Sequence, residues 1–227
     1  MALPKIDVPV FVTRLPASDI EISLRPFSVK EEKILLMADE AKNTDDVLEA
    51  IKQVVNNCIL GSANVNHLPV IDIQYIFIQL RARSVGNIAE IMLTDPDDKK
   101  KYKVEVDLDK IEIVRPEKLS NVVMLNDEIG ITLRYPTIEI ARVENPTTAD
   151  LLMNCMVNIF DQEQVYEVAD QTQEELMEFI GSLTTQHVTK MKKFFESAPK
   201  IKCDLQYTTE DGVEKTLEVS NLQDFFR

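Results

Sequence analysis

Apolar residues recur at helical spacing in two parts of the chain, residues 28–86 and residues 148–195. Each part predicts three helices. Ser28 with Glu31 and Thr172 with Glu175 have the spacing of capping boxes, in which two side chains satisfy backbone donors at a helix start. Thr44 is the expected N-cap of the second helix, whose apolar stripe runs from Val47 to Cys58.

Alternating apolar and polar residues predict strand pairs between and after these helical parts. One hairpin is expected in residues 89–111 and another in residues 199–226, each with a polar turn. A further pair is expected at residues 122–125 and 131–135, and a short strand begins at Ile20. These elements together indicate an α+β fold, in which helical clusters are each followed by an antiparallel β-hairpin.

The order of these elements suggests three sections. Residues 1–26 form an extended N-terminal arm with a first strand, residues 27–115 form an N-terminal α+β half, and residues 116–227 form a C-terminal half. The hairpin segments 103–106 and 216–219 share a weak similarity. A duplication and two unrelated hairpins are both consistent with it.

The two hairpins resemble zinc ribbons from which the metal ligands are missing. A zinc ribbon needs two pairs of Cys or His ligands, but the first hairpin has neither residue and the second has only Cys203. The other cysteines, Cys58 and Cys155, are far away in the sequence, which favours reduced thiols and argues against a disulfide framework. We therefore expect no metal ion and no cofactor.

The composition narrows the range of partners. The net charge of −14 argues against a nucleic-acid-binding surface and against binding to an anionic membrane. The first residues, interrupted by three prolines, lack the pattern of a signal peptide, and no apolar run is long enough to span a bilayer. Acidity favours solubility, and it also suits a basic protein partner.

No known catalytic or phosphate-binding motif is present, so we expect that the chain is not an enzyme. Asp107 and Asp109 alternate along a predicted strand and lie on one face, where a magnesium-dependent hydrolase site could be imagined. A solvated strand face is the preferred interpretation of this pair.

Apolar side chains near both ends of the chain are the candidate contacts for other proteins. Exposed apolar patches commonly mark such sites. The candidates are Ile6, Val8, Val10, Phe11, Val12 and Leu15 in the N-terminal arm, and Leu222, Phe225 and Phe226 in the tail.

Four short motifs resemble the baseplate hub assembly family of T-even-type contractile-tailed bacteriophages. They are Arg25-Pro26-Phe27-Ser28 followed by Glu31-Glu32-Lys33; Leu68-Pro69-Val70-x-Asp72 leading to Leu80-Arg81-x-Arg83-Ser84-x-Gly86; Leu133-Arg134-Tyr135-Pro136-Thr137; and Leu222-x-Asp224-Phe225-Phe226. Members of that family often carry Cys-x-x-Cys knuckles in the hairpins, which this chain lacks.

This resemblance implies a late phage protein that helps to build the central hub of the tail baseplate. It implies a non-enzymatic hub assembly chaperone that binds hub or tape-measure subunits in the host cytoplasm. A structural subunit of the mature baseplate hub, located in the virion, is the alternative. The resemblance carries over no catalytic residue, and the sequence leaves self-association into a homo-oligomer open.

Overall fold

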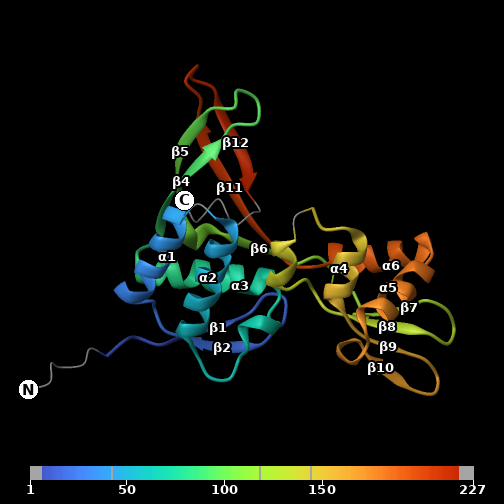
Figure 1. The fold of residues 1–227 in the computed structure, drawn as a ribbon. Coiled ribbons are helices and arrows are strands. Elements are labelled where there is room, and N and C mark those ends of the chain that lie inside the picture. The colour runs from blue at the N-terminus through green and yellow to red at the C-terminus, as the bar shows by residue number, and fades with distance from the viewer. Residues whose placement is uncertain (1–6, 42, 118, 144, 220–227) are drawn as a thin grey trace, which may run out of the picture. The chain divides into compact units, whose positions relative to one another are not determined.

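The computed structural model describes residues 7–41, 43–117, 119–143 and 145–219 (Figure 1). They form two compact units. The first contains the described residues of Met1–Val65, Ile71–Val114 and Lys200–Arg227, and the second contains those of Asn66–Val70 and Arg115–Pro199. Helices and antiparallel sheets occur in both units, which confirms the predicted α+β class.

The terminal hairpin lies in a different part of the fold from the one expected. Residues 116–227 are predicted to form one C-terminal half, but the strands from Lys200 onward belong to the first unit. The physical reason is pairing: β11 (Lys200–Thr208) pairs antiparallel with β6 (Glu112–Val114), far away in the sequence.

Within its described residues, the first unit contains three α-helices, two small sheets and a separate strand pair. Strands β1, β2 and β3 form one sheet in that order, β12, β11 and β6 form another, and β4 pairs with β5. The bounds of the elements not yet given are β1 Phe11–Arg14, β2 Glu21–Leu24, α1 Val29–Ala41, α2 Thr44–Cys58, β3 Ile59–Leu60, α3 Val70–Ser84, β4 Ile88–Thr94, β5 Lys101–Asp107 and β12 Glu214–Val219.

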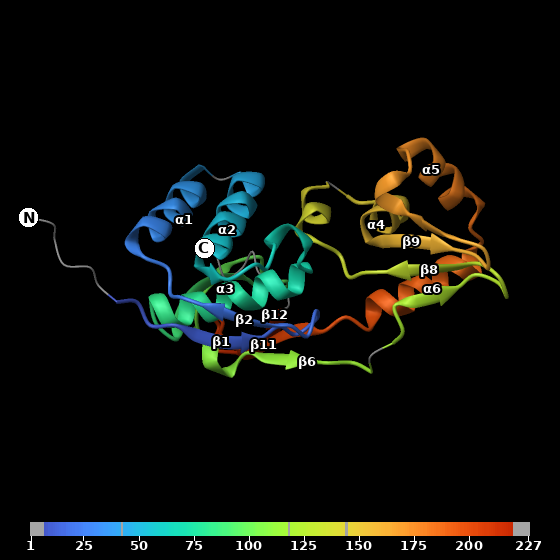
Figure 2. The same cartoon turned by 90° about the horizontal axis from the view of Figure 1, so that it is seen from below.

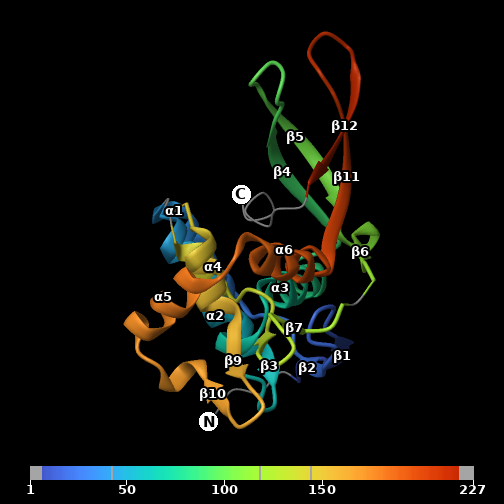
Figure 3. The ribbon, with the colours of Figure 1, turned by 90° about the vertical axis from the view of Figure 1, so that its right-hand side faces the viewer.

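Both hairpins share one hydrophobic core with α3. Buried Ile71 and Ile78 of α3 pack in the same cluster as Ile91 of β4, Val104 of β5 and Leu205 of β11. Figures 1 and 3 show the β4–β5 and β11–β12 hairpins standing side by side. Figure 2 shows α3 between the α1–α2 pair and the β1–β2 strands. The amphipathic hairpins predicted from the sequence thus bury their apolar faces against each other.

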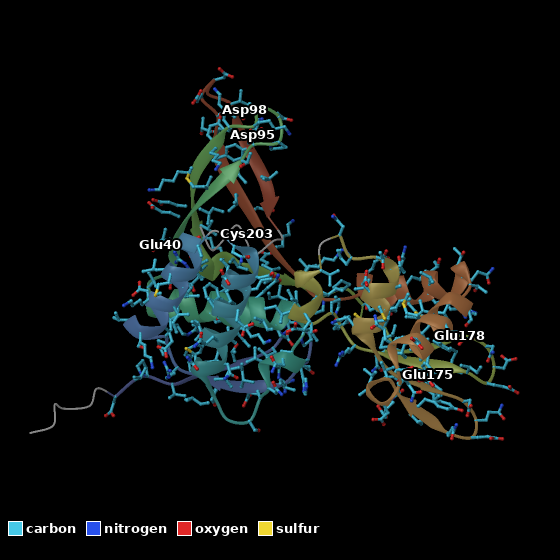
Figure 4. The ribbon with its side chains drawn as sticks, in the orientation of Figure 1. Glu40, Asp95, Asp98, Glu175, Glu178 and Cys203 are labelled. Atoms are coloured by element: carbon cyan, nitrogen blue, oxygen red, sulfur yellow. The ribbon has the colours of Figure 1, made fainter. Side chains whose placement is uncertain are left out.

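A buried carboxylate joins the two hairpins near their tips, where Figure 4 labels Asp95 and Asp98. Asp95 is fully buried and accepts hydrogen bonds from Tyr207 Oη at 2.7 Å and Lys215 Nζ at 2.8 Å. The hydrogen bond from Lys215 lowers the pKa of Asp95 well below its usual range. Burial, with the bond to Asp95, raises the pKa of Tyr207 to about 12. Asp95 therefore stays ionised and fixes one hairpin against the other.

A second buried carboxylate, Glu31, holds the start of α1. Arg25 Nη2 donates to Glu31 Oε1 at 3.0 Å, and the Ser28 backbone N–H donates to Glu31 Oε2 at 2.8 Å. Burial raises the pKa of Glu31, but the hydrogen bonds from Arg25 and Ser28 outweigh it and lower the pKa to about 2. Of the expected capping box, the hydrogen bond from the Ser28 N–H to Glu31 is therefore present, and Arg25 adds an ion pair to it.

A third buried carboxylate, Asp72, holds the turn between β1 and β2. It is fully buried in the first turn of α3 and accepts backbone hydrogen bonds from Ala17 at 2.8 Å and Ser18 at 2.9 Å. Burial raises the pKa of Asp72, and these hydrogen bonds oppose the rise. Asp72 thereby connects α3 to the β1–β2 turn, about 55 positions earlier in the sequence.

The second unit is a four-stranded antiparallel sheet with helices. The strand order is β10-β9-β8-β7. The elements are β7 Val122–Met124, β8 Gly130–Leu133, α4 Thr148–Cys155, β9 Met156–Phe160, β10 Val165–Glu167, α5 Gln173–Ser182 and α6 Thr185–Glu196. Apolar residues of the three helices, among them Leu152, Leu176 and Met191, pack on Val123 and Ile131 of the sheet. Figures 1 and 3 show these helices on one face of the sheet.

The capping residues in the sequence predicted most helix starts correctly. Thr172 and Glu175 form the predicted capping box at α5. At α2 the N-cap is Asn43, one residue earlier than expected, because its side chain accepts from the Asp45 backbone N–H at 3.0 Å. Within the predicted extended arm, residues 11–14 form β1 and pair with β2, so this part of the arm is docked on the first unit.

We expect Asp72→Ala to lower the free energy of unfolding by about 3 kcal/mol, because two buried N–H groups lose their acceptor. Asp72→Asn retains one acceptor oxygen and should cost about half as much. Urea denaturation measures both values. Asp39→Ala, at an exposed carboxylate of α1, is the matched control and should be close to neutral. Equal effects at Asp72 and Asp39 would contradict this role.

The lowered pKa of Glu31 predicts a pH dependence of stability. The ordinary value of 4.5 falls to about 2 in the fold, so the contribution of Glu31 is fully present above pH 4.5 and is lost as the pH falls toward 2. Urea denaturation of the native protein should therefore show a steeper loss of stability between these pH values than Glu31→Gln shows. Parallel curves for the two proteins would argue against the ion pair.

Candidate protein-binding surface

The two faces of β1 have different environments. On the inner face, Phe11 lies opposite fully buried Leu24, and the Arg83 guanidinium carbon is 4.1 Å from the centre of the Phe11 ring. Thr13, on the same face, donates its hydroxyl to Tyr75 Oη at 3.2 Å. These contacts anchor β1 to α3.

The other face of β1 presents apolar side chains to solvent. Val12 is 57% exposed, and Val10 and Val8, at the preceding alternate positions, are 58% and 47% exposed. Across the sheet, Val12 pairs with Ser23, which pairs with Leu60, itself 42% exposed. Val12 and Leu60 thus lie on a sheet that contacts α3, and Val8 and Val10 lie in the segment that leads into β1. We refer to Val8, Val10, Val12 and Leu60 as the β1 surface.

β1 is also an edge strand. In the described part of the chain it pairs only with β2, so one row of its backbone groups remains unpaired. Such an edge is a template for pairing with an added strand. Pro9 and Pro16 flank β1, and proline limits uncontrolled pairing because it has no N–H donor. The arrangement suits a controlled contact with one partner.

The predicted contact residues differ in their exposure to solvent. Val8, Val10 and Val12 are exposed. Leu15 is instead fully buried and closes the β1–β2 turn through a backbone hydrogen bond to Ile20. Phe11 is partly buried under Arg83. The remaining candidates, Ile6, Leu222, Phe225 and Phe226, lie outside the described residues.

Leu60 was missed by the sequence analysis. It follows α2 directly, and its place beside Ser23 depends on the pairing of the two-residue strand β3 with β2. No local pattern marks so short a strand.

The acidic pair that could have suggested a hydrolase is engaged within the protein. Asp107 Oδ1 accepts from the Asp109 backbone N–H at 3.2 Å, and its other oxygen is 3.3 Å from Lys110 Nζ. Asp109 accepts a hydrogen bond from the Asn87 side chain. The described residues contain no group of three or more His, Cys, Asp or Glu side chains that could hold a metal ion.

The cysteines are buried residues that pack inside the protein. All three are buried and free, and Cys203 lies in the core of the first unit, away from the hairpin tips (Figure 4). Burial raises the pKa of Cys58 to about 11 and that of Cys155 to about 12. These thiols therefore stay protonated at neutral pH.

Comparison with known protein families agrees with an interaction role. Residues 8–227 match the family described as T4 bacteriophage base plate protein, so the chain belongs to this family of phage baseplate proteins. Neither the curated proteins nor the solved structures contain a significant match. No helix within the described residues combines the length and apolar character needed to cross a membrane.

The difference between the two faces of β1 can be tested by stability. Phe11→Ala should lower the free energy of unfolding by about 2 kcal/mol, because it removes partly buried ring surface and the contact with Arg83. Val12→Ala, the matched change on the outer face, should stay within about 0.5 kcal/mol of the native protein. Urea denaturation compares them, and a larger loss for Val12→Ala would reverse the assignment of the faces.

Proposed function

We propose that this baseplate protein is a non-enzymatic assembly chaperone of the baseplate hub. It binds hub or tape-measure subunits through the β1 surface during tail assembly in the host cytoplasm. The observation that carries the proposal is the exposed row of Val8, Val10 and Val12 beside an unpaired strand edge.

The anchoring of β1 supports this proposal energetically. A free apolar arm would lose conformational entropy when it bound, and that loss weakens affinity. Here Phe11 and Thr13 already fix β1 against α3, so a partner meets Val12 on a strand that is ordered before contact. Burial of three exposed valines and a leucine can contribute several kcal/mol, at about 25 cal/mol per Å² of apolar area.

The charge of the chain supports a transient role. A net charge of −14 keeps a protein with exposed apolar patches soluble and separate from its own copies. Such a protein can cover an apolar surface of an incomplete assembly and then leave it. A structural subunit of the mature hub is the alternative, and it would keep the same surface buried permanently.

The proposal predicts that Val10→Ser with Val12→Ser reduces recovery of hub or tape-measure subunits at least tenfold. The measurement is a pull-down from infected cells with the tagged protein, quantified by mass spectrometry. Val29→Ser with Val213→Ser is the matched control, because these valines are 80% and 53% exposed elsewhere in the first unit. Urea denaturation confirms that both double variants are folded. Equal recovery by the two variants would exclude the β1 surface as the contact.

Mass spectrometry of purified phage particles separates the two roles. A chaperone is absent from particles although it is abundant in the pull-down with hub subunits. Stoichiometric presence in particles would instead identify a structural subunit of the hub. Absence of phage proteins from the pull-down, together with absence of this protein from particles, would reject both roles.

A further inference from the structure

The sheet of the second unit has an apolar row on the face opposite its helices. Val123 and Ile131 pack toward the helices, so their neighbours along each strand point the other way. The paired positions Met124, Gly130, Phe160 and Val165 therefore form one row across all four strands. Met124 is 41% exposed and Val165 is 60% exposed, while Phe160 is partly buried between them.

Gly130 is what makes this row continuous. A Cβ atom built on Gly130 would lie 2.3 Å from Phe160 Cζ and 2.9 Å from Met124 Sδ. The aromatic ring and the thioether therefore occupy the space that any other residue would fill. Phe160 closes the gap between the strands, and the exposed apolar side chains at the two edges become part of one surface.

Acidic residues border the row. The β7–β8 and β9–β10 turns lie at the same end of the sheet, because both hairpins turn beside the Gly130–Phe160 pair. Asp127 and Glu128 are exposed in the first turn, Glu163 is exposed in the second, and Glu167 is exposed two residues beyond Val165. At the β7 edge, Lys190 donates to the Met124 carbonyl oxygen at 2.9 Å. Negative charge therefore predominates around the row.

We infer that this face is a second protein-binding surface, which takes a segment of another protein with apolar side chains flanked by Lys or Arg. The apolar side chains would cover Met124, Phe160 and Val165, and the basic groups would face the acidic turns. Complementary charge steers such a segment and rejects acidic ones. This inference goes beyond the role of the β1 surface and does not depend on it.

A second copy of the same chain fits this face poorly. Two copies meeting through it would bring four acidic side chains of each copy together, in proteins that each carry a net charge of −14. Repulsion between like charges opposes that arrangement. The charge therefore selects a different, basic partner.

Site-specific photo-cross-linking identifies the occupant. A benzoylphenylalanine at position 165 of the full-length protein is irradiated in infected cells, and the linked peptides are sequenced by mass spectrometry. The same amino acid at position 213, an exposed valine of the first unit, is the control. We expect enrichment at position 165 of a segment of another protein with net positive charge and several apolar residues. A second copy of this chain, an acidic or neutral segment, or no enrichment over position 213 would overturn the inference.

The identified segment, made as a labelled peptide, then tests the row itself by fluorescence anisotropy. Gly130→Ala displaces Phe160 and Met124 and should weaken binding at least fivefold, as should Val165→Ser. Glu128→Gln with Glu163→Gln should also weaken binding several-fold and reduce its salt dependence. Val213→Ser should bind like the native protein. Thermal unfolding measures whether each variant is folded. If Gly130→Ala is unfolded, the affinity of Val165→Ser tests the inference. Unchanged affinity in folded variants would reject this surface.

Discussion

The carboxylate of Asp72 is the constraint on which the β1 surface depends. Asp72 lies in the first turn of α3, where a helix favours negative charge. Its carboxylate accepts hydrogen bonds from the backbone N–H groups of Ala17 and Ser18 in the β1–β2 turn. Leu15 is buried beside this turn, so the chain cannot leave the unit as a free arm at that point. The position of β1, and of Val12 on it, therefore depends on an interaction between residues about 55 positions apart.

The described residues of the motifs on which the resemblance in sequence is based correspond to junctions of this kind. Arg25 pairs with Glu31, the Phe27 N–H donates to Ser84 Oγ, and Tyr135 stacks on Phe194 with ring centres 4.7 Å apart. The hairpins follow the same principle, because Asp95 with Lys215 and Tyr207 joins their tips. In a zinc ribbon the metal performs that task. The resemblance at these residues therefore concerns contacts that hold the fold together.

The sequence predicted what depends on local chemistry. The capping residues placed α1 and α5 because a cap is satisfied within a few residues. It did not predict that the terminal hairpin joins the first unit, because the pairing of Ile201 with Ile113 has no local signal. For the same reason Leu15 was assigned to the exposed arm, and Leu60 was missed although it completes the surface.

The exposed apolar rows and the strong acidity of the chain are best understood together. Val12 on β1 and Val165 on β10 lie on edge strands, the places where unwanted strand pairing most easily begins. A neutral protein with these two edges would risk aggregation. Burying the valines would remove that risk, but it would also remove the exposed apolar surfaces. In the proposed roles, a charge of −14 restricts contact at these edges to partners whose charge is complementary. Solubility alone explains the charge, and the proposed selective binding explains the exposed valines as well.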